Sequence, residues 1–364
     1  MITRLSLPEL EQYIQNIDVA KYTAQRNYLD GSTKLSEYIT RGFISLPRVR
    51  DLLLVHNSEQ TAYKLLNELA WREYWQQTWR VRQDEIFEYF RPLSYQPRQG
   101  IPTAVLEART GITALDAGIR QLYETGYIDN HMRLWLAGLV CNIAKCDWKL
   151  GAAWMHSYLI DGDYASNHLS WQWVAGSYTG AAYLPQQDNI NTYTRTKQSG
   201  TYLDYAYDYL ATMAVPHQLS DIAPTLPDHT GQLLTSSITL NELRAAETLL
   251  LYSPWTLDPL WRAGAAAVRV LIMPADVFAS GAFSQNVLDS IKFFSDLILD
   301  LKILYLGPDE IGQLTAGNIF RKDYPGICYW PGIVDPPELL YPHVQQRFYP
   351  SFSSYFKQTT KLKY

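Results

Sequence analysis

The chain has 364 residues, of which 47% are hydrophobic, so it is long enough for two domains that each bury a sizeable core. Its formal net charge is −5 and it has no basic run, which argues against strong nucleic-acid binding because phosphate contacts need local positive charge. Aromatic residues reach 13%, with 27 Tyr and 11 Trp, and this composition favours stacking contacts.

The three cysteines, Cys141, Cys146 and Cys328, are spaced for neither a disulfide framework nor a four-cysteine metal site. We interpret them as reduced thiols and expect the protein in the cytoplasm. No apolar run reaches the roughly 18 residues that a membrane-spanning helix needs, and residues 1–15 lack the apolar core of a signal peptide. We therefore expect no association with a membrane.

Residues 1–200 are predicted to form a helical domain, because apolar side chains recur at helix spacing while Gly and Pro are sparse. Four stretches carry this pattern: residues 65–75, 116–123, 132–147 and 151–160. Glu68 and Arg72 lie one helical turn apart, so an exposed ion pair on a helix is the first interpretation of these two residues.

Residues 201–245 are predicted to be a connection with short helices, because Pro216, Pro224 and Pro227 interrupt them. Residues 246–364 have a different rhythm, in which short apolar runs alternate with a helical pattern. The runs predict strands at residues 249–252, 268–273, 302–306 and 327–330, and the helical pattern covers residues 283–299. Such alternation indicates a parallel sheet with crossover helices. No Gly-x-Gly-x-x-Gly motif is present there, so dinucleotide binding by this part has no motif support.

The residues with the clearest chemical character follow Ile160. Asp161 and Asp163 precede Asn167, Trp171 and Trp173, all within thirteen residues. Charged groups so close to large aromatic side chains suit a polar, redox-active aromatic ligand better than they suit packing alone.

Asn130 and Arg133 lie one turn apart and therefore share a helix face. One interpretation is an ordinary cap on a surface helix. The functional interpretation pairs Arg133 with Asp161 or Asp163, because an unpaired buried carboxylate is costly.

Other kinds of site lack their sequence signatures. Asp161 and Asp163 are not followed by acids at the spacing of a calcium loop, so no metal site is predicted. His156 and His168 form no His-x-x-x-His pair and are interpreted as structural histidines. A Gly-x-Ser-x-Gly elbow is missing, so serine hydrolase chemistry is not predicted.

In order along the chain, several motifs form one pattern; residues 66–74, for example, read Leu-Asn-Glu-Leu-Ala-Trp-Arg-Glu-Tyr. The pattern consists of Tyr22, Arg26 and residues 32–36, 66–74, 109–112, 116–120, 125–130, 147–148 and 161–176. Over roughly residues 15–195 it resembles the FAD-binding domain of the photolyase/cryptochrome family. The resemblance implies an all-helical photolyase-type FAD-binding domain, followed by a smaller Rossmann-like α/β domain.

The resemblance implies FAD as the cofactor. The residues implied to contact it are Tyr22, Ser32, Thr33, Lys34, Leu35, Ser36, Glu68, Arg72, Asn130, Arg133, Asp161, Asp163, Asn167 and Trp171. Hydroxyl and backbone N–H groups of residues 32–36 would meet the phosphates. Arg133 would pair with Asp161 beside the flavin ring. Asn167 would face the flavin N5, where a neutral amide favours a reduced flavin.

Trp171 and Trp148 match two members of the electron-transfer tryptophan chain of this family. A gapless count places Tyr95 at the third, surface position, and Trp75 and Trp79 are alternatives.

Four residues, Glu68, Trp71, Asn130 and Trp173, match the substrate-facing residues of photolyases that repair cyclobutane pyrimidine dimers. Glu68 would hydrogen-bond the dimer, and the two tryptophans would form the walls around a flipped dinucleotide. Asn130 in place of a histidine argues against repair of (6-4) photoproducts.

Two departures weaken the implied contact with DNA. Leu134 stands where those photolyases usually have a methionine, and Gln186 replaces a usual arginine. We therefore expect damaged DNA to be a partner either as a single strand or as a duplex that binds weakly. The leading hypothesis is a deoxyribodipyrimidine photolyase, a lyase. The alternatives are a cryptochrome-like blue-light photoreceptor or flavin redox protein, and a flavin-binding protein with neither activity.

The order of the two parts also departs from the family, whose α/β antenna domain normally comes first. Here the α/β-like residues 246–364 follow the helical part. A permuted antenna-like domain is one interpretation, but no residue for an antenna chromophore can be named.

Overall fold

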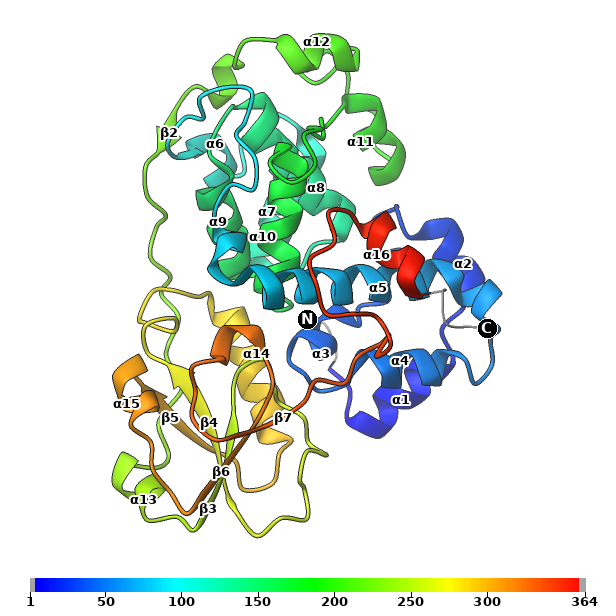
Figure 1. Cartoon of the computed structure of the whole chain (residues 1–364). Helices are drawn as coiled ribbons and strands as arrows, with labels where there is room; N and C mark the ends of the chain where they lie inside the picture. Colours follow the sequence, from blue (N-terminus) through cyan, green and yellow to red (C-terminus); the bar gives the residue numbers. More distant parts are fainter. Residues whose placement is uncertain (1–3, 360–364) are drawn as a thin grey trace.

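The computed structural model describes residues 4–359, which form a helix-rich part followed by a parallel sheet (Figure 1). The helices of the first part are α1 (Leu7–Gln15), α2 (Val19–Gln25), α3 (Ser36–Thr40), α4 (Leu46–Leu53), α5 (Glu59–Arg82), α6 (Thr103–Leu106), α7 (Thr113–Thr125), α8 (Asn130–Gly138), α9 (Trp148–Tyr158), α10 (Tyr164–Ala175), α11 (Gln187–Thr194) and α12 (Tyr207–Thr212). Between them lie the short turns η1 (Gln83–Phe87), η2 (Leu139–Ile143) and η3 (His217–Leu219) and the strands β1 (Ile101–Pro102) and β2 (Ile222–Ala223).

The second part is a five-stranded sheet in which all neighbouring strands are parallel. Its elements are α13 (Leu240–Arg244), β3 (Thr248–Tyr252), β4 (Val268–Pro274), α14 (Gln285–Asp296), β5 (Lys302–Leu306), α15 (Pro308–Gly312), β6 (Asn318–Lys322), η4 (Pro325–Ile327) and β7 (Ile333–Asp335), and α16 (Phe352–Thr359) follows them. The strand order β5-β4-β3-β6-β7 places the first strand in the middle. Doubly wound Rossmann-type folds have this order.

Three of the four predicted strands are confirmed as β3, β4 and β5, and the fourth prediction is wrong. Residues 327–330 do not form a strand because Pro325 begins a tight 3-10 turn there. The remaining strands are β6 and β7. In β6 the buried Arg321 donates to the carbonyls of Cys328 and Trp330. The strand β6 was not predicted because the charged Arg321 interrupts the apolar run from which a strand would be recognised.

The long helix α5 runs between the other elements of the molecule (Figure 1). Helices α6 to α10 lie on one side of it, α1, α3 and α4 lie on the other, α2 lies near its start, and the sheet lies below. The last helix, α16, returns from the sheet and packs along α5. The first and last parts of the chain are therefore neighbours in space.

The predicted connection over residues 201–245 is partly packed. Its strand β2 pairs with β1, with Ala223 opposite Ile101. Arg98 also donates to the carbonyl oxygen of Leu219 at 3.0 Å. The first half of the connection therefore lies against the helical part. The domain bounds 1–200, 201–245 and 246–364 themselves stay predictions.

A fully buried arginine joins the two parts. Arg41 donates to the carbonyl of Ile160 at 2.7 Å, to that of Pro254 at 3.3 Å and to the hydroxyl of Ser290 at 3.3 Å. Burial lowers the pKa of Arg41 to about 10, so the guanidinium remains charged at neutral pH. These bonds connect the segment just before Asp161 to the end of β3 and to α14.

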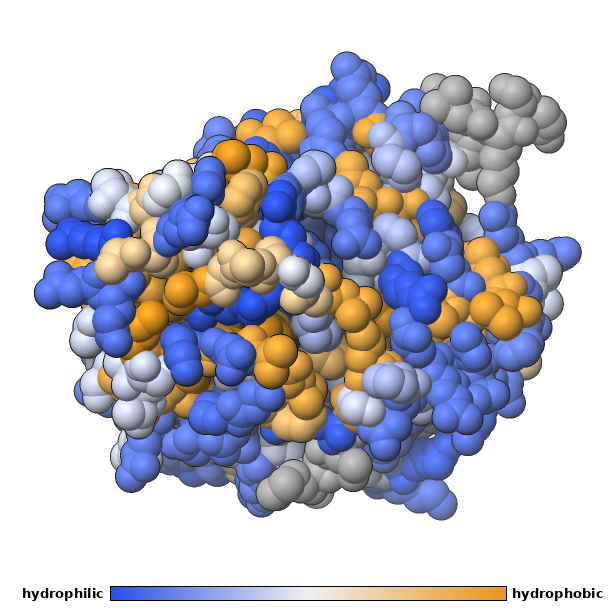
Figure 2. Space-filling model, turned by 90° about the horizontal axis from the view of Figure 1, so that it is seen from below, coloured by the Kyte–Doolittle hydropathy of each residue, from blue (hydrophilic) through white to orange (hydrophobic). Residues whose placement is uncertain are grey.

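The surface mixes hydrophilic side chains with smaller hydrophobic patches, as the face seen from below shows (Figure 2). Leu260, Leu299 and Ile333 are large hydrophobic residues that are more than half exposed. Within residues 4–359, no helix combines the length and apolar character that crossing a membrane requires.

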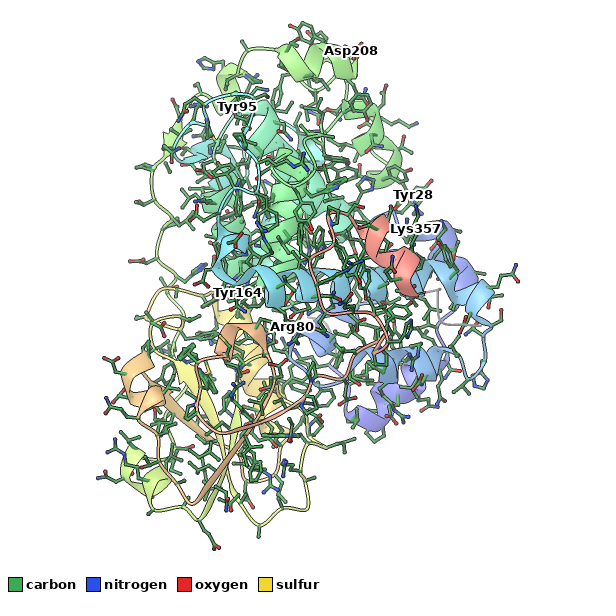
Figure 3. All side chains as sticks on the ribbon, in the orientation of Figure 1. Tyr28, Arg80, Tyr95, Tyr164, Asp208 and Lys357 are labelled. Carbon is green, nitrogen blue, oxygen red and sulfur yellow. The ribbon has the colours of Figure 1, made fainter. Side chains whose placement is uncertain are left out.

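His168 lies on α10 at the centre of a buried aromatic cluster. Its Nδ1 lies 3.0 Å from the carbonyl oxygen of Tyr164, a residue at the boundary between the helices and the sheet (Figure 3). Its ring contacts Phe87 and Trp148 edge-on. Burial lowers the pKa of His168 from its ordinary 6.5 to about 4.

Acid is therefore expected to destabilise the protein through His168. As pH falls below 6.5, His168 becomes protonated in the unfolded chain but stays neutral in the folded protein. The free energy of unfolding therefore decreases until pH reaches about 4, where the folded imidazole is also protonated. The loss is about 1.4 kcal/mol per pH unit over this window. The measurement is the free energy of unfolding in urea at several pH values between 7 and 5. His168→Asn, whose amide can replace the donor to Tyr164, should make this free energy less dependent on pH. The same dependence on pH in the wild type and the variant would contradict the prediction.

Candidate functional site

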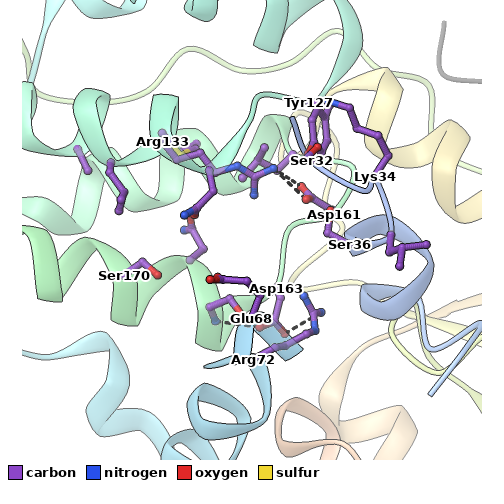
Figure 4. Close-up of a pocket in the computed structure, with 18 of the residues that line it drawn as sticks. Ser32, Lys34, Ser36, Glu68, Arg72, Tyr127, Arg133, Asp161, Asp163 and Ser170 are labelled. Carbon is purple, nitrogen blue, oxygen red and sulfur yellow. Dashed lines mark hydrogen bonds and ion pairs between the residues drawn. The ribbon is translucent and has the colours of Figure 1, made fainter. Parts of the chain in front are cut away.

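A deep cavity opens between α5, α8, α10 and the loop before α3, and we call it the first cavity (Figure 4). It encloses about 1020 Å³, including its open mouth. Its lining residues are Tyr22, Ser32, Thr33, Lys34, Leu35, Ser36, Glu68, Arg72, Tyr127, Asn130, Arg133, Leu134, Ala137, Met155, Leu159, Asp161, Asp163, Ser166, Asn167, Ser170, Trp171 and Val174. Polar and charged groups dominate near the loop, and apolar side chains come from α8, α9 and α10.

An ion pair lies in the wall of the first cavity. Arg133 donates through Nη2 to both carboxylate oxygens of Asp161, at 2.9 and 2.8 Å, and through Nε to the carbonyl of Ile128. The Asp161 side chain is only 2% exposed. Burial alone would lower the pKa of Arg133, but Asp161 and Tyr127 raise it above its ordinary value. Of the two acids that the sequence left open, Arg133 thus pairs with Asp161.

The second acid, Asp163, is held from three directions. One oxygen caps α10 by accepting from the Ser166 N–H at 2.8 Å. The other accepts from the Gln76 amide and, at 3.3 Å, from the Tyr324 hydroxyl of the second part. Arg72 lies 4.0 Å from it and adds positive charge. The Asp163 side chain is therefore fixed in position, and its negative charge is balanced by these donors and by Arg72.

The loop before α3 is fixed by Asp129, a buried acid that the sequence reasoning missed. Its carboxylate accepts from the Asp30 N–H at 2.9 Å and from Lys34 at 3.1 Å, and the Lys34 ammonium lies over the Tyr127 ring. Burial favours the neutral acid, but these hydrogen bonds and the Lys34 charge lower the pKa of Asp129. The backbone N–H groups of residues 32–35 meet no acceptor within residues 4–359, so they can donate to a bound anion.

Asn167 presents an acceptor. Its side-chain nitrogen donates to the carbonyl of Ala152 at 2.9 Å, and only the NH₂ end of the amide can do so. The amide oxygen makes no hydrogen bond to any residue in the described 4–359 range, although Asn167 lines the first cavity. The site therefore offers this oxygen to a ligand N–H group.

Two tryptophans belong to the same buried cluster. Trp171 lines the first cavity, and Trp148 is fully buried with an indole N–H that has no partner among the described residues. Trp148 contacts the half-buried ring of Tyr89 at 6.0 Å, in an edge-on arrangement. Tyr95 instead lies higher in the helical part and donates to the Cys141 carbonyl (Figure 3). The tyrosine whose ring contacts Trp148 is thus Tyr89.

A second cavity adjoins the first. It encloses about 790 Å³ with its open mouth and is lined by Glu68, Trp71, Arg72, Trp75, Asn130, Leu134, Ser166, Ser170 and Trp173. Six of these residues also line the first cavity, namely Glu68, Arg72, Asn130, Leu134, Ser166 and Ser170. Three tryptophans give the second cavity aromatic walls.

The predicted ion pair between Glu68 and Arg72 is wrong. Glu68 accepts a hydrogen bond from Arg26 of α2, and Arg72 donates to the Thr40 hydroxyl at 2.7 Å. Burial raises the pKa of Glu68, and the Arg26 charge opposes this shift. This prediction failed because the true partners of the two residues lie far away in sequence, where helix spacing carries no information.

All fourteen residues predicted to contact a cofactor line the first cavity. Of the residues predicted to face a substrate, Glu68, Trp71, Asn130 and Trp173 line the second cavity. The roles assigned to these residues stay predictions. The sequence reasoning did not assign the cavity residues Tyr127, Leu134, Ala137, Met155, Leu159, Ser166, Ser170 and Val174 to the cofactor. Helix spacing from Asn130 and Arg133 could have found Leu134 and Ala137.

Residues 65–225 match the family model described as the FAD binding domain of DNA photolyase. Residues 65–225 thus form a domain of the photolyase/cryptochrome type. Among curated members of that family, the chain is 32% identical over 194 residues to the deoxyribodipyrimidine photo-lyase of Alkalihalophilus pseudofirmus, covering 50% of this chain and 40% of that protein. It is 31% identical over 184 residues to the cryptochrome DASH of Danio rerio, covering 47% of this chain and 35% of that protein.

Among solved members of the photolyase/cryptochrome family, a Synechocystis cryptochrome overlaps with a TM-score of 0.48 at 23% identity. The overlap covers 53% of this chain and 44% of that one. The chain spans about two fifths of the length of the curated relatives that it matches. The match of residues 65–225 to the family model supports an FAD-binding domain directly.

FAD is the cofactor of this photolyase/cryptochrome domain, and the first cavity has the chemistry to hold it. Free backbone N–H groups of residues 32–35, with the hydroxyls of Ser32 and Thr33, suit phosphate groups. The compensated acids and the unpaired Asn167 oxygen suit the hydrogen-bonding edge of a flavin. Met155, Leu159 and apolar residues of α8 and α10 suit its ring face.

Proposed function

We propose that the protein is a light-driven lyase that splits cyclobutane pyrimidine dimers in DNA. The observation that carries this proposal is that the two cavities share six lining residues. A ligand in the second cavity would lie directly beside the cofactor. FAD supplies a light-absorbing group that can give and take single electrons. Electron transfer between two ligands requires this adjacency.

The second cavity has the walls that a pair of joined pyrimidines needs. Trp71 and Trp173 offer large apolar faces for a dinucleotide that has been flipped out of the DNA stack. Asn130 is exposed and makes no side-chain hydrogen bond to residues 4–359, so its amide can meet the polar edge of a base. Glu68, whose pKa is raised by burial, could donate a proton or a hydrogen bond when Arg26 releases it.

A light-sensing role without repair is the second candidate, and two side chains favour it. The Glu68 carboxylate is bound to Arg26 and so is not free for a substrate. Gln186 caps α11 by accepting from the Asn189 N–H at 3.0 Å, where an arginine would supply charge for DNA. In this role the cavities would bind FAD only, and a partner would respond to the redox state.

The second part supports a further proposal about its origin. Its strand order is that of a Rossmann-type fold, and it follows the FAD-binding domain. We propose that it is a permuted counterpart of the antenna domain. The family match to residue 225 and the β1–β2 pairing support a first domain that extends beyond residue 200.

The deciding experiment measures dimer loss from thymine-dimer oligonucleotides, single-stranded and duplex, under blue light with a reductant. We expect light-dependent repair, stronger on single strands because the chain has a net charge of −5. Trp173→Ala should abolish repair while retaining FAD, because this residue lines only the second cavity. Absence of turnover on both substrates by an FAD-loaded protein would leave the light-sensing role.

A further inference from the structure

The residues after β7 run back along the helical part, and we call residues 336–359 the return segment. It ends in α16, which lies beside α5 (Figure 1). The return segment begins more than 250 residues after α5 ends. The return segment contacts one face of α5, the helix that contributes Trp71 to the second cavity.

A buried carboxylate ties the return segment to α5. Glu73 is 5% exposed and accepts from the backbone N–H groups of Leu340 and Tyr341, the latter at 3.0 Å. It also accepts from the Tyr355 hydroxyl of α16 at 2.8 Å. A charge buried with three donors is stabilised only while all of them stay in place. Glu73 therefore specifies where both ends of the return segment lie.

The next turn of α5 repeats this arrangement with neutral groups. The side-chain amide of Gln77 donates to the carbonyls of Gln345 and Arg347, at 3.0 and 2.9 Å. The Tyr74 hydroxyl donates to the carbonyl of Tyr349 at 2.9 Å. These bonds satisfy backbone carbonyls that would otherwise be buried without partners. The return segment is thus fixed along its length and cannot shift by a residue without losing several of them.

The result of this anchoring is a stack on Trp71. The ring of Phe352 lies 3.9 Å from that of Trp71, centroid to centroid, with an interplanar angle of 11°. Trp71 lines the second cavity and Phe352 does not. One face of the indole is therefore covered by Phe352, and the cavity meets its other face or its edge. Among residues 4–359, no other ring contact of Trp71 is parallel; Tyr74 and Trp75 meet it edge-on or tilted.

We propose that Phe352 is a positioning residue, which fixes the orientation of Trp71 as a wall of the second cavity. The tail that follows the sheet thereby sets the width of the site at which a flat ligand stacks. Phe352 itself does not touch the ligand. The effect on substrate affinity rests on the proposed function, but the effect on Trp71 does not.

The test uses the full-length, FAD-loaded protein labelled with 5-fluorotryptophan, with the ¹⁹F resonance of Trp71 assigned by Trp71→Phe. In Phe352→Leu we expect this resonance to shift and broaden, because the indole loses its stack. Phe352→Tyr keeps an aromatic ring and should restore the wild-type resonance. Phe356→Leu is the matched control: it removes a ring of the same helix that contacts Phe352 and Tyr63 but not Trp71.

The repair assay provides the second readout. Phe352→Leu should raise KM for a thymine-dimer oligonucleotide about two- to tenfold, the factor that corresponds to one aromatic stack, while kcat changes less. FAD content and the rate of flavin photoreduction should stay unchanged. An unaltered Trp71 resonance in Phe352→Leu, or the same change in Phe356→Leu, would overturn the inference. If the wild-type protein repairs no dimers, the proposed function fails, and the ¹⁹F comparison still decides the role of Phe352.

Discussion

Arg133→Met is expected to yield a folded protein that retains little FAD. The substitution keeps much of the apolar volume but leaves the Asp161 carboxylate, 2% exposed, without its charged partner. Breaking a buried ion pair in this way costs about 3–5 kcal/mol. This cost is reduced if the Asp161 carboxylate becomes protonated or if water enters the first cavity and solvates it. Either response removes the ordered polar wall that we assign to the flavin.

The measurement is the flavin absorbance per protein after purification and after incubation with excess FAD. Arg109→Met serves as the control, because the Arg109 and Glu107 side chains are more than half exposed and such pairs contribute at most about 1 kcal/mol. We expect the control to bind FAD like the wild type. Full FAD content in Arg133→Met would show that the ion pair does not support the cofactor.

Trp171→Phe is expected to give the second large effect, a strong slowing of flavin photoreduction with FAD content unchanged. Trp171 is the tryptophan that lines the first cavity, so we propose it as the aromatic electron donor to the cofactor. Phenylalanine preserves the shape of the site but is much harder to oxidise. Photoreduction is followed by the loss of oxidised flavin absorbance under blue light with an external reductant.

Tyr89 provides a finer test of the same path. Tyr89→Phe should slow photoreduction less than Trp171→Phe, because it removes only the outer ring that contacts Trp148. Burial and the nearby Asp147 carboxylate raise the pKa of Tyr89. Tyr95→Phe should have no effect. Equal rates in the wild type and Trp171→Phe would contradict the path as a whole.

The sequence predicted the cavity better than it predicted the contacts around it. Asp161, Asp163, Asn167 and Trp171 lie within eleven residues, and one loop and one helix bring them to the same cavity. Their closeness in the sequence was therefore enough to predict that they line one cavity. The strands β3, β4 and β5 were predictable for a similar reason, since each contains an uninterrupted apolar run, residues 249–252, 270–273 and 303–306 respectively.

Long-range polar contacts could not be predicted in this way. The partners of Glu73 are at least 267 residues away, and Tyr324 reaches Asp163 across 161 residues. Helix periodicity showed only that Glu73 lies on α5, not that it is buried against a distant backbone. Glu68 was misassigned for the same reason, because its nearest charged neighbour in sequence is not its neighbour in space.

The buried Arg41 has a consequence for the order of events on the ribosome. Every residue that lines the first cavity has been synthesised by Val174, yet two of the three acceptors of Arg41 belong to Pro254 and Ser290. Until these arrive, a nascent chain holds an unsatisfied guanidinium beside the segment that carries Asp161. We therefore expect FAD to be retained stably only after the sheet has been translated and has packed against the helices.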